Sequence, residues 1–413
     1  MSTVVVLNLA SSGHINPTLP IVTELVKRGE RVIYYSIEQY RSPIEQTGAE
    51  YRSYSHPESL KPAFHQGGHL GVMAYFAAAA QLNLPALLDD IKIIDPDYIL
   101  LDSMCILGNY VHQLLAIPCI TFSSIFVMHP KLEADAILEM AYGSLPSNVM
   151  LKGLQALHRY FKIAQEIDQE FGCKSPGLIE AFSNQHELNI LFTSKMLHPL
   201  PHLFDQKLYK FVGPSFAPRK ESIDFPFEEL SSEHVIYISL GTIVAHGADF
   251  YQDCFEAFGN RSDRPYPHQV ILSTGNKVDP TTLGPIPDNF IVKPFVPQLE
   301  ILQRTSVFIT HGGMNSTGEA LYHGVPLVII PQRGDAYMVE QQVSKNGAGI
   351  GMLPKQATPQ ALYDAIDKIL STPSYKENAE KIKESFITGG GYIKAVDEIM
   401  NYQKQIVSKQ TVT

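Results

Sequence analysis

The sequence predicts an α/β protein that consists of two doubly wound domains. Both halves of the chain alternate short apolar strand patterns with helical patterns, which is typical of parallel sheets covered by helices. The chain has 413 residues, too many for one hydrophobic core and suited to two domains of roughly 200 residues each. A segment rich in turn residues and charge, residues 213–230, divides it nearly in half.

The first elements have the pattern of a strand, a helix and a second strand. Thr3–Leu9 is a near-continuous apolar run, as in a buried parallel strand. Asn16 is expected to cap the following helix, with Pro17 at its first position. Gly29 is expected to end that helix before a strand at Val32–Ser36. This start therefore predicts a βαβ unit.

One histidine and one carboxylate follow strands of the first half. Ligands of open parallel sheets bind beyond the carboxyl ends of the strands, where His14 is expected to lie. The adjacent helix start favours the neutral, basic ring. Asp102 ends the strand pattern 98–101 and can fix the tautomer of a basic histidine. The alternative is that His14 only caps a turn.

Residues 307–335 predict a strand, a glycine turn, a helix and a second strand. Val307–Ile309 is a short β-branched and aromatic run, and Gly312 and Gly313 let the backbone approach a ligand. A helix is expected from Asn315, with Gly324 just beyond its end. Because the start of a helix attracts anions, this segment predicts a diphosphate pocket.

Each polar residue of this segment also has a structural interpretation. Glu319 would complete a capping box that begins at Ser316. His311 could be an ordinary turn histidine, and HGG also occurs in esterase oxyanion loops. The sequence has no G-x-S-x-G nucleophile elbow, P-loop or G-x-G-x-x-G fingerprint. A hydrolase and the common nucleotide motifs are therefore disfavoured.

Together, the residues from Phe295-Val296-Pro297-Gln298 to Asp335 resemble the donor-binding signature of the family 1 UDP-glycosyltransferases. The pattern of that family is W-x-P-Q, T-H-x-G-x-N-S, E, G-x-P and D-Q, and the chain most resembles the bacterial macrolide and flavonoid branch. The resemblance implies a GT-B fold, in which two Rossmann-like domains face each other across a cleft. It implies an acceptor domain at 1–212, a linker at 213–230, a donor domain at 231–390, and a last helix at 391–413 that crosses back to the first domain.

The resemblance also assigns a part of the donor to each residue of the signature. Phe295, Val296 and Gln298 would contact the uracil base. The diphosphate would be bound by Thr242, His311, Gly313, Asn315 and Ser316. Glu319 would bind the ribose, and Asp335 would bind the sugar. Two positions depart from the family pattern, because Phe295 replaces tryptophan and Ala336 replaces the glutamine after the acid. The first change should weaken stacking on the base, since phenylalanine has a smaller ring system. The second leaves the identity of the sugar open.

The activity implied is inverting transfer of a sugar, expected to be glucose, from a UDP-sugar to an acceptor hydroxyl, with His14 as general base. UDP-sugar is a co-substrate, so no cofactor is expected. No metal is expected either, because the only D-x-D is the turn at Asp95–Asp97, before its strand. A UDP-sugar epimerase and a non-catalytic nucleotide-sugar binder are the alternatives.

The acceptor side of the site is predicted from apolar residues of the first half. The candidates are Ile15, Met73, Phe76, Phe126 and Met128. Such side chains suit a phenolic, flavonoid or macrolide acceptor, but they are equally typical of a packed core.

Composition restricts the partners and the location. A net charge of −10 disfavours a nucleic-acid surface. The longest uncharged apolar stretch, Leu70–Ala80, is too short to span a bilayer, and the first strand has no charged segment before it. A cytoplasmic protein without stable membrane insertion is expected. The four cysteines have no metal-binding spacing and are expected to be reduced. The oligomeric state is left open.

Overall fold

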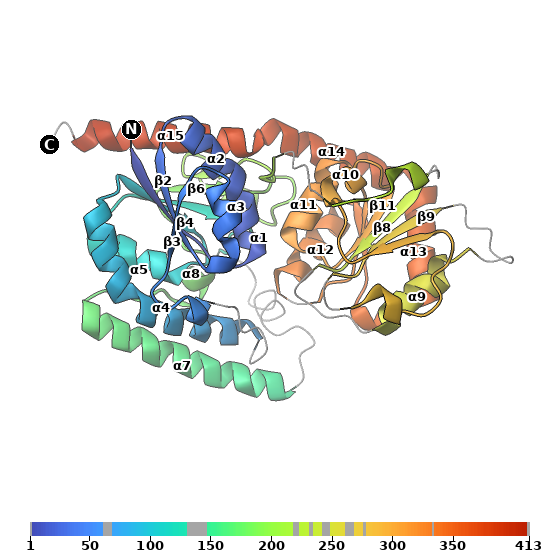
Figure 1. Ribbon diagram of the computed structural model, residues 1–413, viewed down its shortest axis with the longest axis horizontal. Helices are drawn as coiled ribbons and strands as arrows, with labels where there is room; N and C mark the ends of the chain where they lie inside the picture. The colour runs from blue at the N-terminus through green and yellow to red at the C-terminus, as the bar shows by residue number, and fades with distance from the viewer. Residues whose placement is uncertain are drawn as a thin grey trace. The chain divides into compact units, whose positions relative to one another are not determined.

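The structure, a computed structural model, separates into two compact units (Figure 1). The first unit comprises Met1–Lys195, Leu200–Ala217 and Thr388–Thr413, and the second comprises Met196–Pro199 and Pro218–Ile387. The residues that the structure describes are 2–60, 68–129, 147–217, 223–230, 234–241, 248–260, 268–275, 278–332 and 334–410. Each unit contains one parallel sheet.

The first sheet has seven strands in the order β3-β2-β1-β4-β5-β6-β7. These are β3 (Glu50–Ser53), β2 (Arg31–Ser36), β1 (Thr3–Leu7), β4 (Tyr98–Asp102), β5 (Cys119–Ser123), β6 (Leu188–Leu191) and β7 (Tyr209–Phe211). All neighbours pair in parallel. The strand order reverses between β1 and β4, which is the position where ligands bind in open α/β sheets.

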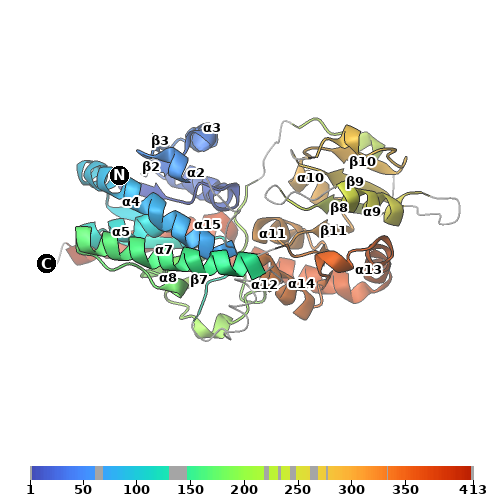
Figure 2. The same cartoon turned by 90° about the horizontal axis from the view of Figure 1, so that it is seen from below.

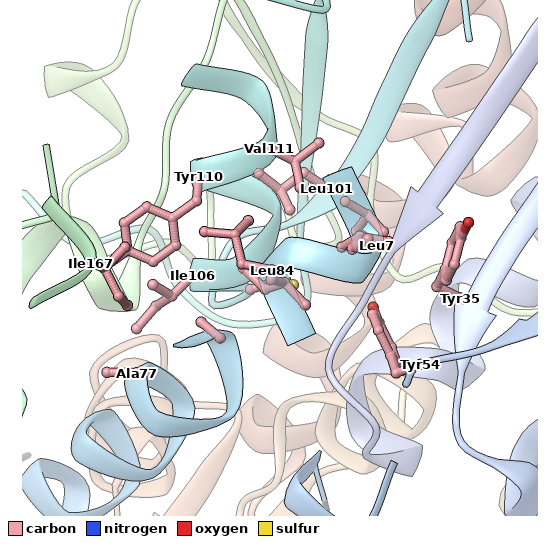
Figure 3. Packing of buried hydrophobic residues seen from close by; sticks show 14 of the residues in the cluster. Leu7, Tyr35, Tyr54, Ala77, Leu84, Leu101, Ile106, Tyr110, Val111 and Ile167 are labelled. Atoms are coloured by element: carbon pink, nitrogen blue, oxygen red, sulfur yellow. The ribbon is translucent and has the colours of Figure 1, made fainter. Parts of the chain in front are cut away.

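Helices cover both faces of this sheet (Figures 1 and 2). One face carries α4 (Gly68–Ile94), α5 (Ile106–Leu115), α7 (Ser147–Phe171) and α8 (Leu178–Phe182); the other carries α1 (Ser12–Ile15), α2 (Leu19–Lys27), α3 (Arg41–Glu45) and α15 (Gly391–Gln410). Figure 3 shows the core under α4 and α5, where Leu84, Ile106 and Tyr110 pack near Leu7 and Leu101 of the strands. The two faces together form the hydrophobic core of the first unit.

Helix α4 corrects an expectation about apolar segments. Leu70–Ile94 is long and apolar enough to cross a membrane by length and composition, so the apolar stretch is longer than Leu70–Ala80. Half of its most apolar window is buried inside the first unit. Ala77, Leu84 and Ile91 belong to the core under α4. The core helix of a soluble protein meets the same criterion, and packing against the sheet and α7 accounts for the apolar face here.

The last helix packs on the first unit. Helix α14 (Pro373–Gly389) ends at a glycine pair, and Gly390 has a φ of +85°. From there α15 runs along α2 (Figure 1), with Val396 and Ile399 buried in the core on that side of the sheet. Arg28, which follows α2 directly, donates to Asp397 at 2.6 Å. Apolar packing and an ion pair therefore hold α15 on the first unit.

The second sheet has six parallel strands in the order β10-β9-β8-β11-β12-β13. These are β10 (Phe290–Lys293), β9 (Gln269–Ser273), β8 (Val235–Ser239), β11 (Val307–Thr310), β12 (Leu327–Ile329) and β13 (Gly349–Gly351). One face packs on α9 (Ala248–Phe258) and α13 (Pro359–Ser371). The other carries α10 (Gln298–Leu302), α11 (Met314–Tyr322) and α12 (Asp335–Lys345) (Figure 1). The order reverses between β8 and β11, so this unit is also doubly wound.

Candidate active site

The predicted catalytic pair lies at the point where the strand order of the first sheet reverses. His14 follows β1 and Asp102 ends β4, the strand that pairs with β1. His14 Nδ1 lies 2.8 Å from Asp102 Oδ2, and the Asp102 side chain is fully buried while 15% of the His14 side chain is exposed. The amide of Met104 donates to Asp102 Oδ1 at 2.9 Å. Both carboxylate oxygens are therefore engaged, one of them by the imidazole.

The tautomer of His14 follows from this contact. A carboxylate oxygen only accepts hydrogen bonds, so Nδ1 carries the proton and the lone pair lies on Nε2. Ser124 Oγ lies 3.1 Å from the same Nδ1. Sequence reasoning missed Ser124, although it directly follows β5, the neighbour of β4. Its place at the carboxyl end of a strand was the available signal.

The helix that carries His14 begins earlier than predicted. Helix α1 starts at Ser12, so His14 lies within a helical turn, and Asn16 has helical dihedral angles. The expected cap at Asn16 is therefore wrong. Asn8 holds the turn instead, since its Nδ2 donates to the carbonyl of His14 at 3.0 Å and to Tyr34 Oη at 2.7 Å. A buried asparagine thus fixes the backbone of the histidine.

In the second unit, the His311 ring is enclosed by two glycines. Gly241 follows β8 and Gly313 precedes α11. A Cβ atom at Gly241 would lie 2.5 Å from His311 Cε1, and one at Gly313 would lie 2.5 Å from His311 Nε2. Gly312 has a φ of +84°. Gly241 and Gly313 therefore leave space for the His311 ring, and Gly312 permits the left-handed backbone of the turn. The sequence had suggested a different reason for the glycines, namely close approach of the backbone to a ligand.

The capping-box interpretation of Glu319 is wrong. Helix α11 begins at Met314 with Gly313 as its N-cap, one residue before the predicted start, so Glu319 lies well inside the helix. Its carboxylate is buried and accepts a hydrogen bond from Gln298 Nε2 at 2.6 Å. Gln298 Nε2 also lies 3.4 Å from Ser316 Oγ. Gly324, with a φ of +67°, terminates the helix as predicted.

Gln298 is itself positioned by residues that the sequence did not single out. Tyr237 Oη donates to Gln298 Oε1 at 3.0 Å. The Tyr237 ring stacks on Phe308 of the adjacent strand, with centroids 4.6 Å apart and planes 8° from parallel. Tyr237 and Phe308 are paired residues of β8 and β11, so register brings them together. The amide of Gln298 therefore has a fixed orientation, with its Nε2 toward Glu319.

The other predicted donor residues lie along the same strand ends. Phe295 is 48% exposed, and Val296 is buried. Asp335 is the first residue of α12. Ala336 is buried, and its carbonyl lies 3.2 Å from the position of a Cβ on Gly312, so it packs against the glycine turn. Asn315 lies in the first turn of α11. Thr242 lies outside the described residues.

The predicted acceptor residues are mostly core residues. Ile15, Met73, Phe126 and Met128 are each less than 5% exposed. Met73 and Ile15 belong to the cores on opposite faces of the first sheet, and Phe76 is partly buried against the same core as Met73. The structure therefore buries these four side chains, and their contact with an acceptor stays a prediction.

Comparison with known proteins gives likenesses over the whole chain. Residues 266–390 match the family model described as erythromycin biosynthesis protein CIII-like, C-terminal domain. The chain is 32% identical to the uncharacterized UDP-glucosyltransferase YojK of Bacillus subtilis, with 98% of each protein covered. It is 26% identical to the oleandomycin glycosyltransferase of Streptomyces antibioticus, over 95% of this chain and 89% of that protein. The solved structure of the kitacinnamycin glycotransferase matches with a TM-score of 0.83 and 26% identity, over 97% of this chain and 98% of the other.

Proposed function

Since the chain belongs to the family 1 UDP-glycosyltransferases, we propose that it transfers glucose from UDP-glucose to a hydroxyl group of a small hydrophobic acceptor. The protein is a glycosyltransferase with a GT-B fold. Beyond this membership, we propose the identity of the sugar, the class of acceptor and the chemical roles of the residues. The observation that carries it is the 2.8 Å contact between His14 and Asp102 at the carboxyl edge of the first sheet.

In the proposed reaction, His14 is the general base. Its Nε2 takes the proton of the acceptor hydroxyl while the oxygen forms a bond to the anomeric carbon. The bond from that carbon to the diphosphate oxygen breaks, and UDP leaves with the electron pair. Attack opposite the leaving group inverts an α-linked sugar to a β-glycoside. Asp102 stabilises the imidazolium that forms, and this kind of base catalysis typically contributes ~10²–10⁴ in rate.

The leaving diphosphate would be bound at the start of α11. The first amide groups of a helix point away from its start and carry partial positive charge, which favours an anion. His311, fixed between Gly241 and Gly313, is placed beside this start. We propose that these groups meet the charge of UDP without a metal ion. Glu319, oriented by Gln298, would accept hydrogen bonds from the ribose.

The acceptor class rests on the relatives and on chemistry. One relative is an oleandomycin glycosyltransferase, and another is a UDP-glucosyltransferase. We therefore propose phenolic, flavonoid or macrolide hydroxyl groups as acceptors. Of the predicted acceptor residues, Phe76 has a partly exposed side chain, and the other four are buried.

The experiment combines the purified protein with UDP-glucose, a panel of flavonoids and macrolides, and excess EDTA, and detects glycosides by mass spectrometry. We expect β-glucosides from the wild type and a loss of at least about 100-fold in the rate for His14→Ala. His202→Ala, which changes an exposed histidine of the same unit, should leave the rate unchanged. Full activity of His14→Ala would refute the base, and loss of activity in EDTA would refute metal independence. Conversion of UDP-glucose without an acceptor would support an epimerase instead.

A further inference from the structure

A cluster of two histidines and a cysteine lies at the opposite edge of the first sheet. His112 is in the last turn of α5, Cys119 is the first residue of β5, and His186 precedes β6, the neighbour of β5. One ligand atom from each residue lies within 4.8 Å of those from the other two. Cys119 is buried, while the histidines are only partly buried. The sequence does not reveal this group, because His186 is far along the chain from His112 and Cys119 and the three residues lack a known metal-binding spacing.

We propose that His112, Cys119 and His186 bind one Zn²⁺ ion. Two imidazoles and a thiolate are ligands that Zn²⁺ prefers, and three protein ligands leave a fourth position for water. Tetrahedral Zn–N and Zn–S bonds place ligand atoms about 3.5 Å apart. Side-chain movement on the order of 1 Å would therefore close the site from the present arrangement. The partial exposure of both rings provides a path for the ion.

The tautomer of His112 suits metal binding. His112 Nδ1 lies 2.7 Å from the carbonyl oxygen of Ile117. A carbonyl oxygen only accepts, so Nδ1 carries the proton and Nε2 has the lone pair that a metal needs. Metal-binding histidines usually donate their second N–H in this way. The turn that brings the carbonyl of Ile117 into place includes Ala116, whose φ is +53°.

His186 is held by two further hydrogen-bonding residues. Its Nδ1 lies 2.7 Å from Thr121 Oγ1, and Thr121 follows Cys119 by two positions, on the same face of β5. The side chain of Asn189 accepts from the His186 amide at 3.0 Å and donates to the His186 carbonyl at 2.7 Å. Asn189 is buried in β6. Both the ring and the backbone of His186 are thus fixed by residues of the sheet.

The electrostatic setting of the cluster also favours a cation. The last turn of a helix carries partial negative charge, and His112 lies in the last turn of α5. The cluster shares no residue with the proposed catalytic site, which is at the carboxyl edge of the sheet. A bound ion would cross-link α5, β5 and the segment before β6.

The test uses the full chain freed of metal with a chelator. Titration with Zn²⁺ against a chromophoric competitor should show one tight site per chain. Cys119→Ser, His112→Gln and His186→Gln should each weaken Zn²⁺ binding at least about tenfold, because loss of even an outer-shell partner typically costs about 10–100-fold. Cys173→Ser removes a partly exposed thiol of the same unit and should leave the affinity unchanged. Circular dichroism establishes that each variant is folded.

A second measurement does not depend on the folding of any variant. Co²⁺ bound by a thiolate gives a charge-transfer absorption in the near ultraviolet, which we expect in the wild type and in Cys173→Ser. Wild-type protein that binds no Zn²⁺ tightly, or that binds Co²⁺ without this absorption, would overturn the proposal. Equal loss of binding in Cys173→Ser and Cys119→Ser would also overturn it. These outcomes are independent of glycosyl transfer, so failure of this site leaves the proposed function untouched.

Discussion

Replacing Asp102 with asparagine should prevent His14 from acting as a base, although the asparagine side chain has nearly the same size and shape as aspartate. The Met104 amide donates to Asp102 Oδ1, so the oxygen of an asparagine is required at that position. The NH₂ group of the new side chain in Asp102→Asn would then face His14 Nδ1. Because NH₂ is a donor, Nδ1 must become the acceptor, and the ring proton moves to Nε2. Nε2 can then no longer accept the proton of an acceptor hydroxyl.

The size of the effect follows from the burial of the pair. The site of Asp102 is fully buried, so water cannot restore the lost arrangement, and keeping both donors face to face would cost about 1–3 kcal/mol. Loss of general-base catalysis lowers a rate by ~10²–10⁴, which corresponds to about 3–5 kcal/mol in the barrier. We expect kcat for Asp102→Asn to fall within this range. The KM for UDP-glucose should stay within about threefold, because the residues that we propose for donor binding lie in the second unit.

The assay measures UDP release and glucoside formation under saturating UDP-glucose. Asp97→Asn is the matched control, because Asp97 lies just before the opposite end of the same strand and accepts a hydrogen bond from the Thr3 amide. That variant should retain the wild-type kcat. If Asp102→Asn keeps more than about a tenth of the wild-type kcat while folded, Asp102 does not set the tautomer of His14. An equal loss in Asp97→Asn would point to general destabilisation.

Three further predictions concern other residues. Glu319→Ala should weaken UDP binding by about 1–3 kcal/mol in calorimetry, since the ribose hydroxyls would lose the acceptor that we propose for them; unchanged affinity would exclude a ribose contact. Gly313→Ala should displace the His311 ring and destabilise the second unit by about 1–3 kcal/mol in urea unfolding, whereas unchanged stability and UDP affinity would contradict the enclosure of the ring. Burial lowers the pKa of His198 to about 3, so the unfolded chain binds the extra proton below about pH 6.5 and stability should fall from there toward pH 3. His198→Gln should lose less stability over that window, and a parallel loss would show that His198 titrates normally.

The fold was predictable because its signals are local. Apolar runs such as Thr3–Leu9 and Val307–Ile309 correspond to β1 and β11, and Gly29 and Gly324 have positive φ beyond helix ends as expected. Helix starts were less predictable. Asn16 looks like an N-cap from its residue type alone, but Asn8 and Tyr34 hold the preceding turn in a helical conformation through contacts distant in sequence. Tertiary contacts therefore decided where the first helix begins.

Some residues of the candidate site could likewise be predicted from the sequence, and others could not. His14 and Asp102 could be paired from the sequence because each follows a strand, and parallel strands bring their carboxyl ends to one edge. Tyr237 could not be identified, because its role depends on stacking against Phe308 across the sheet. The burial of the apolar acceptor candidates could not be predicted, for a related reason. Residue type does not distinguish a buried Met73 from a side chain that lines a pocket, and only the packing does.

The two edges of the first sheet show how position selects chemistry for one residue type. Helices that follow parallel strands start at the carboxyl edge and return to the amino edge, so the two edges have opposite partial charge. His14 lies in the four-residue helix α1 that follows β1, and its Nδ1 faces the carboxylate of Asp102, so its lone pair lies on Nε2. His112 lies in the last turn of α5, beside the start of β5, where a cation is favoured. A histidine beside a buried carboxylate at the carboxyl edge of such a sheet is thus a candidate for a base, and one in the last turn of a helix at the amino edge is a candidate for a metal ligand.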